Sequence, residues 1–203
     1  MPHPDGDRDQ VWVIVKRTLT SGTKRYVEYL DDSTLVYDRR MTDSSVVYNN
    51  CVATSVFTGL DHLECERVTI QADGRWVGTC VVAQGRVGIA TPATKVEIGQ
   101  PFVSEAITLP PEASIGGQSI QPMRKRWARL FVRAKDSCDL LVRTATGQLE
   151  CLRNGVTTGP GILDYDAPRM GDFNDARITI RQERPLPATV LMVGGILDIG
   201  EAG

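Results

Sequence analysis

The only residues with the side-chain types and the spacing to form a catalytic centre lie around His62, one of two histidines in the chain. Asp61 and Glu64 flank it, and Ser55 precedes it in the sequence. A hydrolase could combine such a serine, histidine and carboxylate, but no Gly-x-Ser-x-Gly segment is present to position the nucleophile. We therefore interpret Gly59–Glu64 as a turn whose Asp61 and His62 side chains bind nearby backbone amides, and we expect no catalytic residue.

Metal and cofactor chemistry is also not indicated by the sequence. The acidic clusters at 5–7, 31–32 and 164–166 lack the alternating ligands of a calcium-binding loop. The five cysteines are odd in number and contain no Cys-x-x-Cys pair, which argues against a zinc site and a disulfide framework. Cys80 and Cys151 lie in strand-like runs and are predicted to be buried. No glycine-rich segment has the residues of a nucleotide-binding loop, so we predict no cofactor.

A third kind of chemistry is suggested by residues 124–134, where arginines alternate with two aromatic side chains. Strand alternation would place 128, 130, 132 and 134 on a core face, and 125, 127, 129, 131 and 133 on the opposite face. Such a surface could bind nucleic acid by stacking, or it could be a subunit interface enriched in Arg and aromatic residues. The near-neutral chain favours the interface. The predicted interface residues are Arg124, Arg126, Trp127, Arg129, Phe131 and Arg133.

Length, composition and charge limit the classes of protein to which this chain can belong. The chain has 203 residues, 41% of them hydrophobic, which is enough for a packed core in one large or two small domains. Its 23 basic and 25 acidic residues leave a formal charge of −2, so no overall attraction to nucleic acid or anionic lipid is expected. No apolar run approaches a membrane span, and the polar start does not resemble a secretion signal. We expect the chain to accumulate in the cytoplasm in which it is made.

Apolar residues recur mostly with a period of two, in short runs bounded by Gly, Pro, Asn or Asp, which predicts an all-β fold of antiparallel strands. Residues 11–19 and 24–30 are expected to form a hairpin around a Ser-Gly turn. Tight turns are expected at Asp73-Gly74 and Gln84-Gly85. Further strands are predicted at 67–72, 76–82, 87–89, 95–98, 124–134, 140–144 and 148–152, together with a pair formed by 176–181 and 188–194.

Stretches of weak alternation, or rich in glycine and proline, are predicted to be loops, at 30–50, 110–122 and 154–174. The simplest architecture is a small β-barrel or β-sandwich module inserted in a larger antiparallel β unit. We predict an N-terminal hairpin with an extended crossing segment in 1–55, the small β-module in 56–109, and a C-terminal antiparallel unit in 110–203 that packs with the hairpin.

Several motifs, in one order, resemble the distal part of the tail nozzle proteins of bacteriophages. They are the hairpin Val11–Leu30, the turn Gly59-Leu-Asp-His-Leu-Glu64, the hairpin Ala72-Asp-Gly74, and the segments Pro92-Ala-Thr-Lys-Val-Glu-Ile-Gly-Gln-Pro-Phe102 and Arg184-Pro-Leu-Pro-Ala-Thr-Val-Leu191. Cys65 follows the first turn, where the family usually has Gly. The resemblance spans about residues 8 to 200, whereas family members are commonly several times longer.

The resemblance implies a structural virion protein rather than an enzyme. Nozzle proteins form homo-oligomeric rings, usually homohexamers, that enclose the tube through which double-stranded DNA is ejected. The implied location is the virion tail, after assembly in the host cytoplasm. The implied partners are further copies of the chain, an adaptor, tail fibres, a second nozzle chain that completes a split nozzle, the DNA passing through the lumen, and the host cell surface.

Two other classes of function stay open from the sequence. A tail-tip module that binds a host receptor or a carbohydrate would need an exposed aromatic platform, which Trp76 or Trp127 could supply. A cell-wall hydrolase would need a pair of carboxylates in a cleft, and no such pair stands out in the sequence. We therefore expect a structural tail component, with the receptor-binding module as the alternative.

Overall fold

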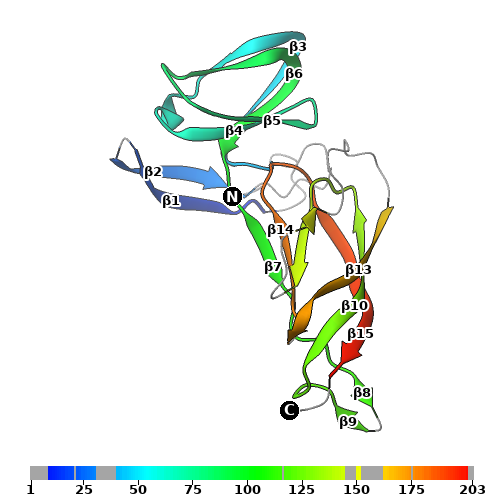
Figure 1. Ribbon diagram of the computed structural model, residues 1–203. Coiled ribbons are helices and arrows are strands. Elements are labelled where there is room, and N and C mark those ends of the chain that lie inside the picture. Colours follow the sequence, from blue (N-terminus) through cyan, green and yellow to red (C-terminus); the bar gives the residue numbers. More distant parts are fainter. Residues whose placement is uncertain are drawn as a thin grey trace. The chain divides into compact units, whose positions relative to one another are not determined.

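The computed structural model describes residues 9–20, 22–30, 40–115, 117–144, 150–151, 162–174 and 176–200. It confirms the predicted all-β class: every strand pair in these residues is antiparallel, and their only helix is a single 3-10 turn, η1 (Asp61–Leu63). Backbone contacts divide the chain into two compact units, of which the first ends at Phe102 and the second begins at Val103 (Figure 1). The described residues contain no helix with the length and hydropathy to cross a membrane.

The first unit begins with the predicted hairpin, formed by β1 (Trp12–Leu19) and β2 (Gly22–Tyr29). The two strands pair in register from Trp12 opposite Tyr29 to Leu19 opposite Gly22. One face of the hairpin is half-buried and the other is exposed along its whole length. The alternation of β-branched and aromatic residues that predicted this hairpin therefore corresponds to two faces with different surroundings.

A four-stranded sheet with strand order β3-β6-β4-β5 forms the rest of this unit. Its strands are β3 (Asp43–Thr58), β4 (Arg67–Ala72), β5 (Arg75–Val81) and β6 (Arg86–Gln100). The core between them contains Phe57, Leu60, Leu63, Val68, Val96 and Ile98. Both predicted turns are confirmed, since Asp73-Gly74 and Gln84-Gly85 have the positive φ angles that two-residue hairpin turns require.

Two predictions for this sheet were wrong. Part of the stretch predicted as an extended loop belongs to β3, and the two short strands expected at 87–89 and 95–98 are both parts of β6. The pairing of β3 with β6 contains several register shifts, one of them between Asn49 and Thr54. Such irregularities interrupt the hydrophobic alternation, so the sequence pattern shows fragments of a strand whose backbone is continuous.

The Asp73 carboxylate joins the β4–β5 turn to β6. Its Oδ1 atom accepts hydrogen bonds from the Thr94 hydroxyl at 3.0 Å and from the backbone N–H of Lys95 at 2.9 Å. These bonds, that of Lys95 foremost, hold the pKa of Asp73 below its usual value. Glu64 bridges another turn, with its carboxylate accepting the N–H groups of Gln84 at 2.9 Å and Gly85 at 2.7 Å, and its pKa is lowered for the same reason.

The first unit is therefore expected to lose stability in acid. A carboxyl group whose pKa is lowered in the folded state stabilises the protein above its unfolded pKa of about 4, and this contribution disappears as the pH falls through the folded pKa. We expect the urea midpoint to fall as the pH is lowered below about 5, and to fall less steeply in Asp73→Asn. Parallel pH profiles of the two proteins would contradict this role of Asp73.

The second unit contains the remaining strands. They are β7 (Ser104–Ile107), β8 (Ser114–Ile115), β9 (Gln118–Ser119), β10 (Lys125–Lys135), β11 (Leu141–Thr144), β12 (Glu150–Cys151), β13 (Ile162–Asn174), β14 (Ile178–Gln182) and β15 (Thr189–Ile199). One sheet has the order β13-β10-β15, another has the order β12-β11-β14-β7, and β8 pairs with β9. Figure 1 shows β10 running between β13 and β15. The core of this unit contains Trp127, Leu130, Val132, Val142, Ala176 and Ile178.

Three predictions for this unit were wrong, although its longest predicted strand is present as β10. Most of the predicted loop 154–174 is the strand β13, while 152–161 lies outside the described residues. The predicted loop 110–122 contains the short hairpin of β8 and β9. The strands predicted to pair with each other, β14 and β15, instead pair with β11 and β7 and with β10. Their partners are distant in sequence, so local patterns carried no information about them.

The predicted division into 1–55, 56–109 and 110–203 stays a prediction. Within the first unit, the described contacts of the hairpin are with β3 and with the turn around η1. The Tyr26 hydroxyl donates to the His62 carbonyl at 2.9 Å, and Arg17 forms an ion pair with Asp43 at 2.7 Å. These contacts attach the half-buried face of the hairpin to the rest of the first unit.

Candidate functional site

The strand β10, which carries all the predicted interface residues except Arg124, contains a β-bulge that changes which side chains are exposed. Its register with β15 shifts between Trp127 and Arg129. As a result Lys125 and Trp127 are buried together with Leu130 and Val132, which pure alternation would place on the opposite face. The predicted face assignment was therefore wrong for Lys125 and Trp127.

Trp127 belongs to the core of its own unit. Its side chain is 6% exposed, and its indole N–H donates to the Ala176 carbonyl at 2.8 Å. Gly195 lies so close that a Cβ atom there would be 2.9 Å from the indole ring. The aromatic platform that the sequence suggested at Trp127 is therefore not exposed on this unit.

Lys125 is a fully buried cation at the start of β10. Its Nζ atom donates to the backbone carbonyls of Ile120 at 2.9 Å, Gln121 at 3.2 Å and Met123 at 3.4 Å. These carbonyls replace the water that a buried ammonium group loses. Lys125 therefore holds the segment that precedes β10 in place.

The predicted interface residues beyond the bulge remain on the outside of the sheet. Arg129 and Arg133 are exposed, and the Arg129 guanidinium lies 5.2 Å from the ring centroid of half-buried Phe131. On β15, Ile196 and Met192 pair with Arg129 and Arg133 and are 55% and 48% exposed. We call the resulting surface the outer strip; it consists of Arg129, Phe131, Arg133, Met192 and Ile196.

The other two predicted residues lie nearer the start of the strand. Arg124 precedes β10 and is exposed, and Arg126 is half-buried and forms an ion pair with Asp198 at 3.1 Å. In register with Phe131 and Arg133, β13 has Asp166 and Asp164. Because Arg126 is paired with Asp198, this surface is of mixed charge, which disfavours a track for a phosphate backbone.

An apolar surface lies on the hairpin of the first unit. Trp12 pairs with Tyr29 and Ile14 with Val27, and these four side chains are between 44% and 76% exposed. The rings of Trp12 and Tyr29 contact each other, with centroids 5.4 Å apart. We call these four residues the hairpin face. Sequence alternation predicted the hairpin, but it could not show which of its faces would stay uncovered.

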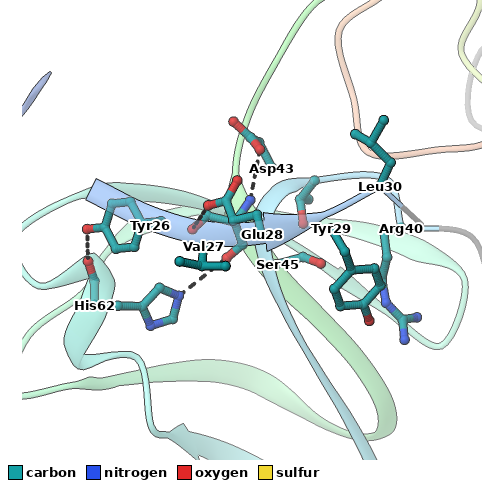
Figure 2. A pocket seen from close by; sticks show the side chains of 11 residues that line it. Tyr26, Val27, Glu28, Tyr29, Leu30, Arg40, Asp43, Ser45 and His62 are labelled. Carbon is teal, nitrogen blue, oxygen red and sulfur yellow. Dashed lines mark hydrogen bonds between the residues drawn. The ribbon is translucent and has the colours of Figure 1, made fainter. Parts of the chain in front are cut away.

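A cavity of about 450 Å3 lies beside β2 (Figure 2). Its lining residues are Tyr26, Val27, Glu28, Tyr29, Leu30, Arg40, Thr42, Asp43, Ser44, Ser45 and His62. Hydrogen bonds among these residues hold its walls: the Tyr26 hydroxyl donates to the His62 carbonyl, and the His62 Nε2 atom lies 3.3 Å from the Ser44 carbonyl oxygen. The cavity combines aromatic, hydroxyl and charged side chains.

Arg17 connects the hairpin to the rim of this cavity. It forms a bidentate ion pair with Glu28, in which Nη2 donates to Oε2 at 2.9 Å. It also donates a hydrogen bond to Asp43 at 2.7 Å. The hydrogen bonds to Glu28 and then to Asp43 outweigh burial and raise the pKa of Arg17 above its ordinary value. The charges of Glu28 and Asp43 are thus committed to a structural network, which suits an architectural role better than proton transfer.

The candidate catalytic residues do not form a triad in the described contacts. His62 contacts the Ser44 carbonyl, and Glu64 accepts the turn amides of Gln84 and Gly85. Among the described residues, no hydrogen bond joins His62 to Asp61, Glu64 or Ser55. The His62 side chain does bond to the backbone, but its partner is the Ser44 carbonyl of β3 rather than an N–H of its own turn.

The cysteines and acidic residues provide no ligand cluster in the part of the chain that the structure describes. No group of three or more His, Cys, Asp or Glu side chains is arranged there to hold a metal ion. All five cysteines are free. Cys80 and Cys151, predicted to be buried, are only half-buried, and burial raises the pKa of the Cys80 thiol.

Two comparisons with known proteins found no match. No protein-family model matches the chain, and no curated protein matches it. The candidate functional surfaces are therefore identified by their geometry alone. They are the outer strip on the second unit, and the hairpin face and its neighbouring cavity on the first.

Proposed function

We propose that this chain is a structural protein of a bacteriophage tail, one subunit of a nozzle ring that conducts double-stranded DNA during ejection. The observation that carries the proposal is the exposure of large apolar side chains on two surfaces of different units, the hairpin face and, between the arginines of the outer strip, Met192 and Ile196. Contiguous apolar surfaces bordered by polar residues are typical of protein–protein contacts. Two different surfaces on one chain suit the head-to-tail contacts that close a ring.

The nozzle-like motifs lie at turns and edges that the fold needs. Cys65, at the position where the nozzle turn usually has Gly, has a φ of 66°, a backbone conformation that favours glycine. Leu186, within the Arg184–Leu191 motif, is buried, and its carbonyl accepts a hydrogen bond from the Gln182 side chain at 3.1 Å. These observations support the resemblance because they give its residues structural roles.

The mechanism of such a ring is mechanical. Complementary faces of neighbouring subunits close the ring, and the lumen must hold the duplex without binding its phosphates tightly. The sequence pI near 5.7 suits a lumen of neutral or acidic character. The expected partners are an adaptor, a second nozzle chain, tail fibres and the host cell surface, with the ring being a homohexamer.

Electron microscopy of virions and of the purified chain tests the proposal. We expect antibody against the chain to label the distal tail, and the purified chain to form closed rings of uniform symmetry. Antibody against the major capsid protein is the control for labelling position. Absence of the chain from virions, or a monomer at all concentrations, would refute the nozzle function.

The exposed Trp12 and Tyr29 rings favour one alternative, a carbohydrate-binding or receptor-binding module at the tail tip. Two aromatic side chains in tilted contact beside a cavity lined with hydroxyl and charged groups have the composition of a sugar site. Trp76 is a weaker platform, since it is 37% exposed and its indole N–H donates to the Thr69 hydroxyl at 3.1 Å. A glycan array distinguishes the two functions: binding that Tyr29→Ala abolishes, by a chain without rings, would favour the alternative.

A further inference from the structure

The strand β15 is an edge strand with an exceptionally apolar sequence. Its 11 residues, Thr-Val-Leu-Met-Val-Gly-Gly-Ile-Leu-Asp-Ile, include one charged residue, Asp198, which is paired with Arg126. Leu191 is 49% exposed, in addition to Met192 and Ile196 of the outer strip. In the residues described, β15 pairs only with β10. Unpaired N–H and C=O groups along such an edge form a template for another strand, so proteins usually protect long apolar edges.

The hairpin of the first unit also has a strand edge without a partner strand in the described residues. Within the described part of the chain, β1 pairs only with β2. A two-stranded hairpin is marginally stable by itself and gains from a third strand. The side chains of β2 line the cavity, and Figure 1 shows β1 on the side of the hairpin away from the β3-β6-β4-β5 sheet. Both outer edges of the hairpin lack a partner strand in the described residues, and that of β1 carries exposed Trp12 and Ile14.

We propose that β1 of one copy pairs antiparallel with β15 of a neighbouring copy, which joins the two sheets across the subunit boundary. The proposal rests on the proposed function, because the ring supplies the neighbouring copy. Pairing satisfies both free edges with backbone hydrogen bonds, the mode by which strands are added to sheets. It also places exposed apolar side chains of both strands beside one another.

The side chains favour one register. If Ile14 lies opposite Met192, antiparallel pairing places Trp12 opposite Gly194. A Cβ atom at Gly194 would meet nothing within 4 Å, so there is space above this glycine for a side chain from a neighbouring strand. An aromatic side chain opposite a strand glycine fills such a place. In this register Lys16 of β1 lies opposite Val190, and β15 itself has no basic residue.

Cysteine cross-linking between two differently tagged copies tests the contact. One copy carries Ile14→Cys and the other Met192→Cys, both in a background in which exposed Cys51 and Cys65 are replaced by serine. Directly opposite strand residues have Cα atoms about 4.5–5.5 Å apart, within the range of a disulfide. We expect a cross-linked heterodimer on mild oxidation. The control is Val77→Cys, an equally exposed residue on the edge strand β5, which should not cross-link to Ile14→Cys.

A second pair of variants tests the edge without new cysteines. Leu191→Lys places a charge on the β15 edge, and Val77→Lys does the same at a position of matched exposure, 47%, on β5. We expect Leu191→Lys to raise the concentration needed for assembly at least about tenfold, and Val77→Lys to leave it unchanged. Circular dichroism and urea unfolding show whether both variants fold, and analytical ultracentrifugation measures assembly.

The outcomes separate this proposal from the nozzle function. Rings located in the tail whose copies do not cross-link between Ile14→Cys and Met192→Cys overturn the strand pairing alone. Cross-linked copies of a chain that is absent from virions overturn the nozzle function and support the pairing. A chain that stays monomeric at every concentration overturns both.

Discussion

Replacing Trp127 with alanine is expected to lower the free energy of unfolding of the second unit by about 3–5 kcal/mol. The indole is almost completely buried among Leu130, Val132 and Ile178, so truncation leaves a cavity in the middle of the core. The loss includes the hydrogen bond that the indole N–H donates to the Ala176 carbonyl. Urea unfolding, with intrinsic fluorescence and circular dichroism followed together, measures the change.

Two further variants separate the contribution of packing from that of the hydrogen bond. Trp127→Phe retains most of the packing but removes the donor, so we expect a smaller loss of about 1–2 kcal/mol. Phe131→Ala removes the other aromatic side chain of β10, which is half-buried on the outer strip, and should cost about 1 kcal/mol or less in the isolated chain. If Trp127→Ala were no more destabilising than Phe131→Ala, Trp127 would not be a core residue.

Alanine substitutions at the adjacent glycines Gly194 and Gly195 of β15 should have very different effects on the free energy of unfolding. A Cβ atom at Gly195 would lie 2.0 Å from the Arg129 carbonyl oxygen and 2.9 Å from the Trp127 ring. The Arg129 atom belongs to the backbone of β10 and cannot move without disturbing the strand pairing. We therefore expect Gly195→Ala to lower the free energy of unfolding by about 3 kcal/mol.

Gly194→Ala is the matched control, because a Cβ atom there would meet nothing within 4 Å. It should change stability by less than about 0.5 kcal/mol, or raise it slightly by reducing the freedom of the unfolded chain. Thermal and urea unfolding of both variants under identical conditions provide the comparison. Equal effects of the two substitutions would show that β15 does not approach β10 as closely as described.

Much of the fold was predictable because it depends on neighbours in the sequence. The period-two alternation of Trp12–Leu19 and the turn residues at Asp73-Gly74 act over a few residues, and strands and hairpin turns are formed at that range. The same patterns could not show that residues 162–174 form a strand. Glycine and proline lower the local preference for a strand there, but β13 lies along the whole length of β10.

The candidate surfaces show the same division. The sequence by itself determined the β class, the N-terminal hairpin, the tight turns, and the run of arginines and aromatic residues in β10. Only the tertiary structure decided that Trp127 faces the core while Arg129 and Phe131 face outward, because one bulge shifts the alternation by a residue. It also decided that Met192 and Ile196 lie beside them, since strands distant in sequence choose their partners through packing of the whole unit rather than through local pattern.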